Sequence, residues 1–336
     1  MNAPEKVKQY DRDAHIVGNI VHLEHFNVVV DDQRLATLFY ITGIGGTRDP
    51  YLFTGLDNMW VNFGRTQCHL PSRGSKPEVL RGTIGFVVPS LEDLKKRFEH
   101  AGREMKRVVP ERETKFSWRE KDGVIEATCP WGNRVRCHAP SPEFGNTELG
   151  IVYVDFDVPE GTADGIARFY KEILGALTKV AGNGGGKAAH ITVGLKQELI
   201  FRETDKKLPE YDGHHLQVYV EDFGGPHKKL KRLNLITEES DRCQYRFEDI
   251  VDLDTGDVLF TIEHEIRSMT HPLYARRLVN RNPAQTNRNY IWGGDEWVWG
   301  THDTVGPSGR QADPLKAKKA PTIAKRRALR TQQQAM

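Results

Sequence analysis

The chain has 336 residues, of which 38% are hydrophobic and 28% charged, and this composition is typical of a folded protein with about two domains. No segment approaches the roughly 18 consecutive apolar residues of a membrane span, and the polar N-terminus lacks the apolar stretch of a signal peptide. We therefore expect a cytoplasmic protein with no membrane partner. The four cysteines show no CxxC spacing, which excludes a disulfide framework and a zinc knuckle.

The positive charge is concentrated at the C-terminal end of the chain. Residues 311–336 carry seven lysines and arginines and one acid, Asp313, so this segment is +6 and the rest of the chain, within a total of +2, is −4. A basic segment without apolar periodicity buries too little surface to offset its ordering entropy, so we expect a basic disordered tail. It has no clear nucleic-acid motif, and we interpret it as a solubilising tail rather than an electrostatic contact with nucleic acid or anionic lipid.

Four segments with alternating polarity open four similar stretches of the chain. In each segment the second, fourth and sixth residues are apolar, which is the pattern of a strand with one buried face. The four segments are 25–30, 83–88, 153–158 and 215–220. Because only one face of such a strand is needed for the core, the side chains on the other face are free for chemistry.

Helical patterns follow these strands. Apolar residues spaced i, i+3, i+4 after acidic or proline turns predict amphipathic helices at 35–39, 91–98 and 166–173, and a short helix at 227–233. Two or three further strands follow each helix. The four stretches begin 58, 70 and 62 residues apart, so the order of strand, helix and strands is an internal repeat.

The repeat predicts an α+β fold in which paired βαβββ modules form two cupped mixed β-sheet domains. A segment rich in proline, serine and glycine at 138–150 places the two domains at 15–142 and 148–270, each with two modules. Residues 271–310 form an aromatic-rich extension, which we expect to pack on a domain or on a second subunit, so that a homodimer is expected.

Short motifs accompany the repeat. They are Phe39-Tyr40 and Phe169-Tyr170 near the helix ends, and Pro-Trp-Gly-Asn-Arg at 130–134 before a closing strand. With these motifs the chain, over residues 20–265, resembles the vicinal oxygen chelate superfamily, which includes glyoxalase I, bleomycin and fosfomycin resistance proteins and the extradiol dioxygenases. Its two-domain, four-module arrangement is most similar to the extradiol dioxygenases. The resemblance implies a metal-dependent enzyme, an oxidoreductase or a glyoxalase-like lyase, acting on a small-molecule substrate with vicinal oxygens.

The resemblance also implies a divalent metal held by side chains on the first and last strands of the modules. In the C-terminal half, His215 and Glu263 give two ligands of a facial triad for Fe(II), with Asp155 or Tyr153 as the third. This assignment requires a register in which Phe260 is a core residue. Tyr153 and His215 are then the expected catalytic side chains, and Zn, Mn or Ni are the alternatives to iron.

In the N-terminal half the equivalent positions hold His25, His69, Thr83 and Arg136. A guanidinium has no lone pair for a metal, so this set is incomplete, although His25, His69 and His138 give a possible three-histidine site. We expect these side chains on one concave surface. The alternative function is therefore a metal-free binding or resistance-type protein, in which Arg136 holds an anionic substrate with the histidines as donors; a third possibility is a water-lined cup without a ligand.

Overall fold

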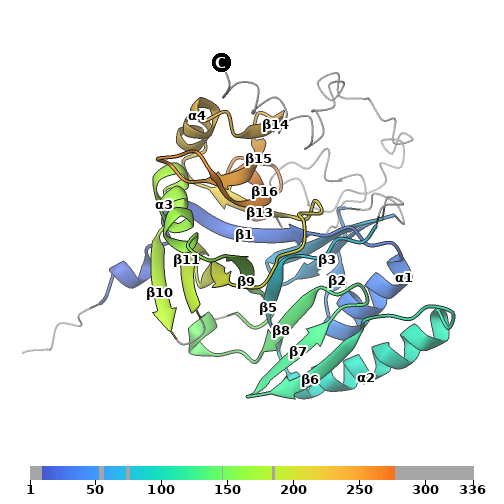
Figure 1. The fold of residues 1–336 in the computed structure, drawn as a ribbon. Helices are drawn as coiled ribbons and strands as arrows, with labels where there is room; N and C mark the ends of the chain where they lie inside the picture. The colour runs from blue at the N-terminus through green and yellow to red at the C-terminus, as the bar shows by residue number, and fades with distance from the viewer. Residues whose placement is uncertain (1–9, 53–56, 73–75, 146, 184–185, 277–336) are drawn as a thin grey trace, which may run out of the picture.

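The computed structural model describes residues 10–52, 57–72, 76–145, 147–183 and 186–276, and these residues form two open eight-stranded mixed sheets (Figure 1). The predicted α+β fold of paired βαβββ modules is confirmed. The first strands of the four modules are β1 (Ile20–Asn27), β5 (Gly82–Val87), β9 (Gly150–Pro159) and β13 (His215–Val220). All but the first six residues of the predicted extension, and the whole of the predicted tail, lie outside the described residues.

The remaining elements complete each module. Module 1 contains α1 (Gln33–Ala36), the wider helical segment η2 (Thr37–Ile44), β2 (Thr47–Arg48), β3 (Asn58–Phe63) and β4 (Thr66–Pro71). Module 2 contains α2 (Leu91–Val108), β6 (Ser117–Lys121), β7 (Val124–Thr128) and β8 (Arg134–His138). Module 3 contains α3 (Ala163–Leu174), β10 (Thr178–Asn183), β11 (Gly186–Gly194) and β12 (Gln197–Thr204). Module 4 contains α4 (Gly224–Arg232), β14 (Ile236–Asp241), β15 (Gln244–Val251) and β16 (Val258–Ser268). Two short 3-10 turns are η1 (Asp13–His15) and η3 (Pro142–Phe144).

Each sheet combines modules from both halves of the chain. The first sheet has the order β14-β15-β16-β13-β1-β4-β3-β2, so it joins module 1 to module 4. The second has the order β10-β11-β12-β9-β5-β8-β7-β6 and joins module 2 to module 3. The first strands pair antiparallel at the centre, β1 with β13 and β5 with β9. The sheets therefore do not follow the division at 15–142 and 148–270, and that division stays a prediction about folding units.

The apolar faces of the sheets share one core. Phe26 of β1 packs against Phe86 of β5, and Phe156 of β9 packs against Phe260 of β16, so aromatic side chains join the two sheets within each half of the chain. The predicted assignment of Phe260 to the core is confirmed, since it is 3% exposed. With the apolar faces buried together, the opposite face of each sheet is left to polar side chains.

Two segments that connect the sheets also contact each other. The backbone N–H of Val79, between β4 and β5, donates to Asp212, between β12 and β13, at 2.7 Å. Next to it, the carboxylate of Glu78 accepts a hydrogen bond from the N–H of Val29 at 2.8 Å. Burial raises the pKa of Glu78 to about 7. The negative charges of Asp212 and Glu263 act in the same direction, whereas the hydrogen bond from Val29 acts against it.

This pKa predicts that Glu78→Gln stabilises the protein at alkaline pH. Between the ordinary value of 4.5 and the folded value of about 7, the folded protein keeps a proton that the unfolded chain releases, so stability falls as pH rises through this range. Glutamine keeps an oxygen acceptor for Val29 but carries no charge. We expect the free energy of unfolding of the variant, relative to wild type, to be about 1–2 kcal/mol higher at pH 8 than at pH 5, allowing for partial exposure.

Urea unfolding at the two pH values measures this difference. Glu99→Gln, on the exposed side of α2, removes the same charge without burial and serves as the control. A Glu78→Gln effect that is the same at both pH values would contradict the assignment.

Candidate metal centre

Four adjacent strands at the centre of the first sheet bring their polar faces together. The register pairs His25 with Gln67 and Gln217, and His215 with Asn27 and Glu263. Two rows of side chains therefore cross the strands in the order β4, β1, β13, β16. The first row is Gln67, His25, Gln217 and Glu265. The second row is His69, Asn27, His215 and Glu263.

Three histidines of these rows converge on one point. Ligand nitrogens of His25, His69 and His215 lie within 4.8 Å of one another. His25 is fully buried, His215 is 9% exposed and His69 is partly exposed. The Nε2 atoms of His25 and His215 have no hydrogen-bond partner among the described residues. Burial lowers the pKa of both imidazoles, so each keeps the neutral form whose lone pair a metal requires.

A bulge in β1 aims two consecutive side chains at this point. The register between β1 and β13 shifts between Leu23 and His25, so Glu24 and His25 both face the cup. Glu24 accepts a hydrogen bond from His25 Nδ1 at 3.2 Å. Burial raises the pKa of Glu24, but the hydrogen bond to His25 and the charge of Arg267 outweigh it and lower the value to about 2. An ionised carboxylate on Nδ1 leaves the lone pair of His25 on Nε2, and a carboxylate on the far nitrogen commonly orients a histidine that binds a metal.

The bulge is held by a side chain of the other sheet. The Gln197 amide of β12 accepts from the N–H of Leu23 at 3.2 Å and donates to the C=O of Leu23 at 3.0 Å. It also donates to the C=O of Ile151 in β9, a strand of its own sheet, at 3.0 Å. The bonds to Leu23 therefore connect the two sheets. β4 pairs with β1 only over His25–Asn27. At Leu23 the Gln197 amide therefore takes the place of a neighbouring strand, because it hydrogen-bonds both the N–H and the C=O of that residue.

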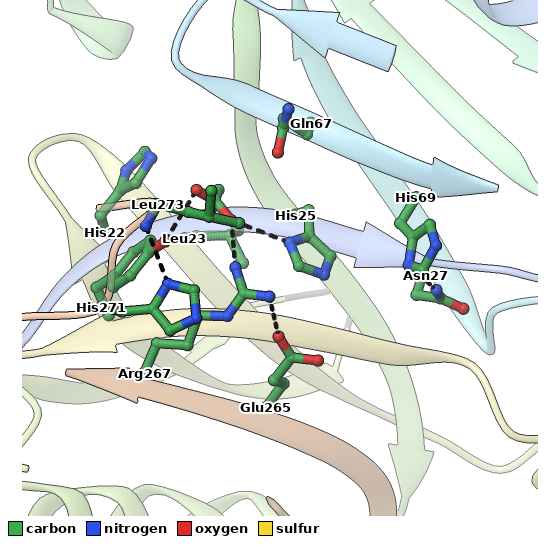
Figure 2. A network of polar contacts seen from close by, with 12 residues as sticks. His22, Leu23, His25, Asn27, Gln67, His69, Glu265, Arg267, His271 and Leu273 are labelled. Carbon is green, nitrogen blue, oxygen red and sulfur yellow. Dashed lines mark hydrogen bonds and ion pairs between the residues drawn. The ribbon is translucent and has the colours of Figure 1, made fainter. Parts of the chain in front are cut away.

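Charged groups form a connected network around the histidines (Figure 2). Arg267 of β16 donates to Glu24 at 3.0 Å and contacts Glu265 at 2.6 Å. Arg246 of β15 binds both Glu263 and Glu265. Nε2 of His215 lies 3.8 Å from Glu265, so this carboxylate stands beside the histidine cluster.

His69 lies at the open end of the cluster. The Trp60 ring stacks on it with centroids 3.8 Å apart and planes at 12°, and meets His25 edge-on at 4.8 Å. Asn27 donates to Nδ1 of His69, and Asn58 accepts from its Nε2. An aromatic wall and two amides therefore orient this imidazole.

The structure brings together part of the predicted site. His25, His69, His215 and Glu263 share one cup, and Glu263 faces the same side as His215, as the register argument required, with 3.5 Å between Glu263 Oε1 and His215 Nδ1. Sequence reasoning missed Glu265, which lies two residues beyond Glu263 on the same face, with its Oε2 3.8 Å from His215 Nε2. The alternation of charge in residues 261–265 was the available signal.

The other predicted residues lie on the second sheet, which corrects three predicted sets. Asp155 and Tyr153 are on β9, so neither completes a triad with His215; Asp155 pairs instead with Arg202 at 2.9 Å. His138 on β8 hydrogen-bonds the Tyr153 hydroxyl at 2.8 Å and does not join His25 and His69. Arg136, also on β8, pairs with Glu126 at 2.9 Å, so it cannot hold a ligand together with those histidines. The reason is the pairing of module 1 with module 4, which separates residues expected on one surface.

Comparison with known proteins gives a likeness in fold. No family model and no curated protein sequence matches the chain. Among solved structures, a "putative dioxygenase" from Bacillus subtilis is 13% identical, covers 83% of this chain and 91% of its own, and has a TM-score of 0.53. A point mutant of glyoxalase I from Zea mays is 13% identical, covers 74% of this chain and 94% of its own, and has a TM-score of 0.52. The predicted resemblance to the vicinal oxygen chelate superfamily is thus confirmed at the level of the fold.

Among the residues that the structure describes, no helix is long and apolar enough to cross a bilayer.

The network predicts a large effect of Arg267→Met on stability. Arg267 is 8% exposed on its side chain and neutralises Glu24 and Glu265, so its loss leaves two buried carboxylates short of a partner. We expect the free energy of unfolding to fall by about 3–5 kcal/mol. Arg202→Met, which breaks the pair with Asp155 on the second sheet at a side chain 34% exposed, is the matched control and should cost less than about 1 kcal/mol. Equal losses for both variants in urea unfolding would show that the Arg267 pairs are not effectively buried.

Proposed function

We propose that the protein is a metal-dependent enzyme of the glyoxalase or extradiol-dioxygenase type, with its metal centre in the first sheet. The observation that carries this proposal is the convergence of His25, His69 and His215, with unpartnered Nε2 atoms on two of them. Leaving a buried polar atom without a partner costs about 1–3 kcal/mol. Two such atoms aimed at one point favour a cation that binds between them.

The donor set fits a divalent transition metal. His25 and His69 from module 1, and His215 with Glu265 from module 4, occupy equivalent positions on first and last strands. Glu265 keeps lone pairs for a metal beside its bonds to arginine, because a carboxylate accepts at about four sites. Coordination by His69 would replace one of its two amide hydrogen bonds. Three imidazoles and one carboxylate suit Fe(II), which remains the predicted ion, as well as Zn, Mn and Ni.

A divalent cation held here would supply a Lewis acid that polarises two adjacent oxygens of a substrate. The side chains of the chain perform the other tasks. Trp60 gives a flat apolar wall at the partly exposed end, where a substrate enters past His69. Arg246 fixes Glu263 and Glu265. Glu263 Oε1 lies 3.5 Å from His215 Nδ1, and burial raises the pKa of this carboxyl against the opposing charge of Arg246. Both features favour Glu263 as the group that takes or returns a substrate proton.

Metal analysis tests the proposal directly. Protein purified without chelator and supplied in turn with Fe(II), Zn, Mn or Ni should hold about one equivalent of at least one of them. His25→Ala and His215→Ala should each weaken metal binding at least about tenfold, because each removes a ligand. Asp155→Ala, on the second sheet, is the control and should bind metal as wild type does. Less than about 0.1 equivalent in wild type with all four ions would leave the metal-free binding protein as the function.

Activity assays then distinguish the reaction class. Oxygen uptake with catechols by the Fe(II) form indicates a dioxygenase, whereas isomerisation of a hemithioacetal by the Zn or Ni form indicates a glyoxalase. In whichever assay responds, Glu263→Gln should lower kcat by about 10²–10⁴-fold while the metal content stays at the wild-type level, since proton transfer by a positioned carboxylate contributes this much. Full kcat in Glu263→Gln would exclude Glu263 as the proton acceptor.

A further inference from the structure

Gln217 occupies the middle of the candidate site. It is two residues from His215 on β13, and the register places it between His25 on one side and Glu265 on the other. Cross-strand neighbours project from the same face of a sheet, so its side chain rises into the histidine cluster. The side chain is fully buried, at 0% exposure.

Among the described residues, the side-chain amide of Gln217 has no hydrogen-bond partner. Neither its Oε1 nor its Nε2 is bonded within the described part of the chain. The other polar members of its row each make at least one polar contact: Gln67 donates to Asp49 at 2.7 Å, His25 binds Glu24 through Nδ1, and Glu265 binds two arginines. Two orphaned groups on one buried side chain destabilise the folded protein, and a leucine would fill the same space without that cost.

The inner end of the cup lies beyond Gln217. Tyr219 is the next residue on the same face of β13. Its ring packs against that of Tyr274 with the centroids 4.8 Å apart, and its hydroxyl donates a hydrogen bond to Glu24. Figure 2 shows His271 and Leu273 lying over Arg267 at this end, away from His69. A small molecule that enters past His69 therefore meets Gln217 after it meets the histidines.

We propose that Gln217 is the substrate-recognition residue of the metal centre. Its carbonyl accepts from, and its NH2 donates to, a substrate that carries a hydroxyl donor beside an oxygen acceptor, as in an α-hydroxycarbonyl compound or a singly ionised catechol. This inference rests on the proposed function, because the two substrate oxygens that bind Gln217 are the same two adjacent oxygens that the metal would polarise. In a buried site a matched donor and acceptor reject analogues that lack one partner, since the amide is then left unpaired.

The test uses the variant Gln217→Leu and the probe 4-nitrocatechol, whose absorbance changes on ionisation. In the metal-loaded protein we expect the Kd for the probe to rise at least tenfold, with metal content within twofold of wild type. The melting temperature of the protein without probe should stay level or rise, because the orphaned amide is gone. The monomethyl ether of the probe should bind wild type at least tenfold more weakly than the probe itself, and this preference should be smaller in the variant, where only the metal centre still distinguishes the two compounds. Gln33→Leu, in α1 and outside the cup, is the control and should bind both compounds as wild type does.

The outcomes separate this inference from the proposed function. If wild type holds metal and Gln217→Leu binds the probe as tightly as wild type does, Gln217 recognition is overturned and the metal centre stands. Loss of metal or a lower melting temperature in Gln217→Leu would make the residue a ligand or a structural group, and would also overturn it. If wild type holds no metal, the proposed function fails; probe binding to the metal-free protein that requires Gln217 would still support recognition, and its absence would overturn it.

Discussion

The candidate site depends on the hydrogen bonds between the Gln197 amide and the backbone of Leu23. They satisfy β1 at its bulge, where none of the described strands pairs with it on that side. Gly194, with φ of +150°, makes room for this amide, since a Cβ there would lie 2.4 Å from Gln197 Oε1. The bulge turns both Glu24 and His25 to one face, so a contact from the second sheet determines the orientation of a candidate metal ligand in the first.

The charged side chains of the cup carry one more negative than positive charge. Glu24, Glu263 and Glu265 face two guanidiniums, Arg246 and Arg267, so the buried groups sum to −1 when the histidines are neutral. Burial keeps His25 and His215 neutral by lowering the pKa of each. Buried charge is stable only when it is paired. A divalent cation would bind the imidazoles in their neutral form, whereas a proton would convert them into cations.

The two polar faces of the molecule have diverged although both are built from paired modules. On the second sheet the charged side chains pair with one another, as Arg202 does with Asp155 and Arg136 with Glu126. Tyr153 lies across Gly85, where any Cβ would meet the ring at 2.3 Å, and hydrogen-bonds His138. Within the described residues only the first sheet gathers three ligand-type side chains, so the duplicated fold supports one candidate metal centre.

Local alternation of apolar residues was enough to determine the modules, because the period of two in a strand and the spacing of a helix are properties of neighbouring residues. It placed the first strand of each of the four modules, although β1 begins five residues before the predicted start, and it missed β2, β6, β10 and β14. It also placed Glu263 on the face of His215 through the core position of Phe260. It could not reveal which modules share a sheet, because strand pairing is a contact between residues some 190 positions apart, such as His25 and Gln217. Only the tertiary structure joined module 1 to module 4, and it thereby united His25 and His69 with His215, brought in Glu265, and left Asp155, Tyr153, Arg136 and His138 on the other sheet.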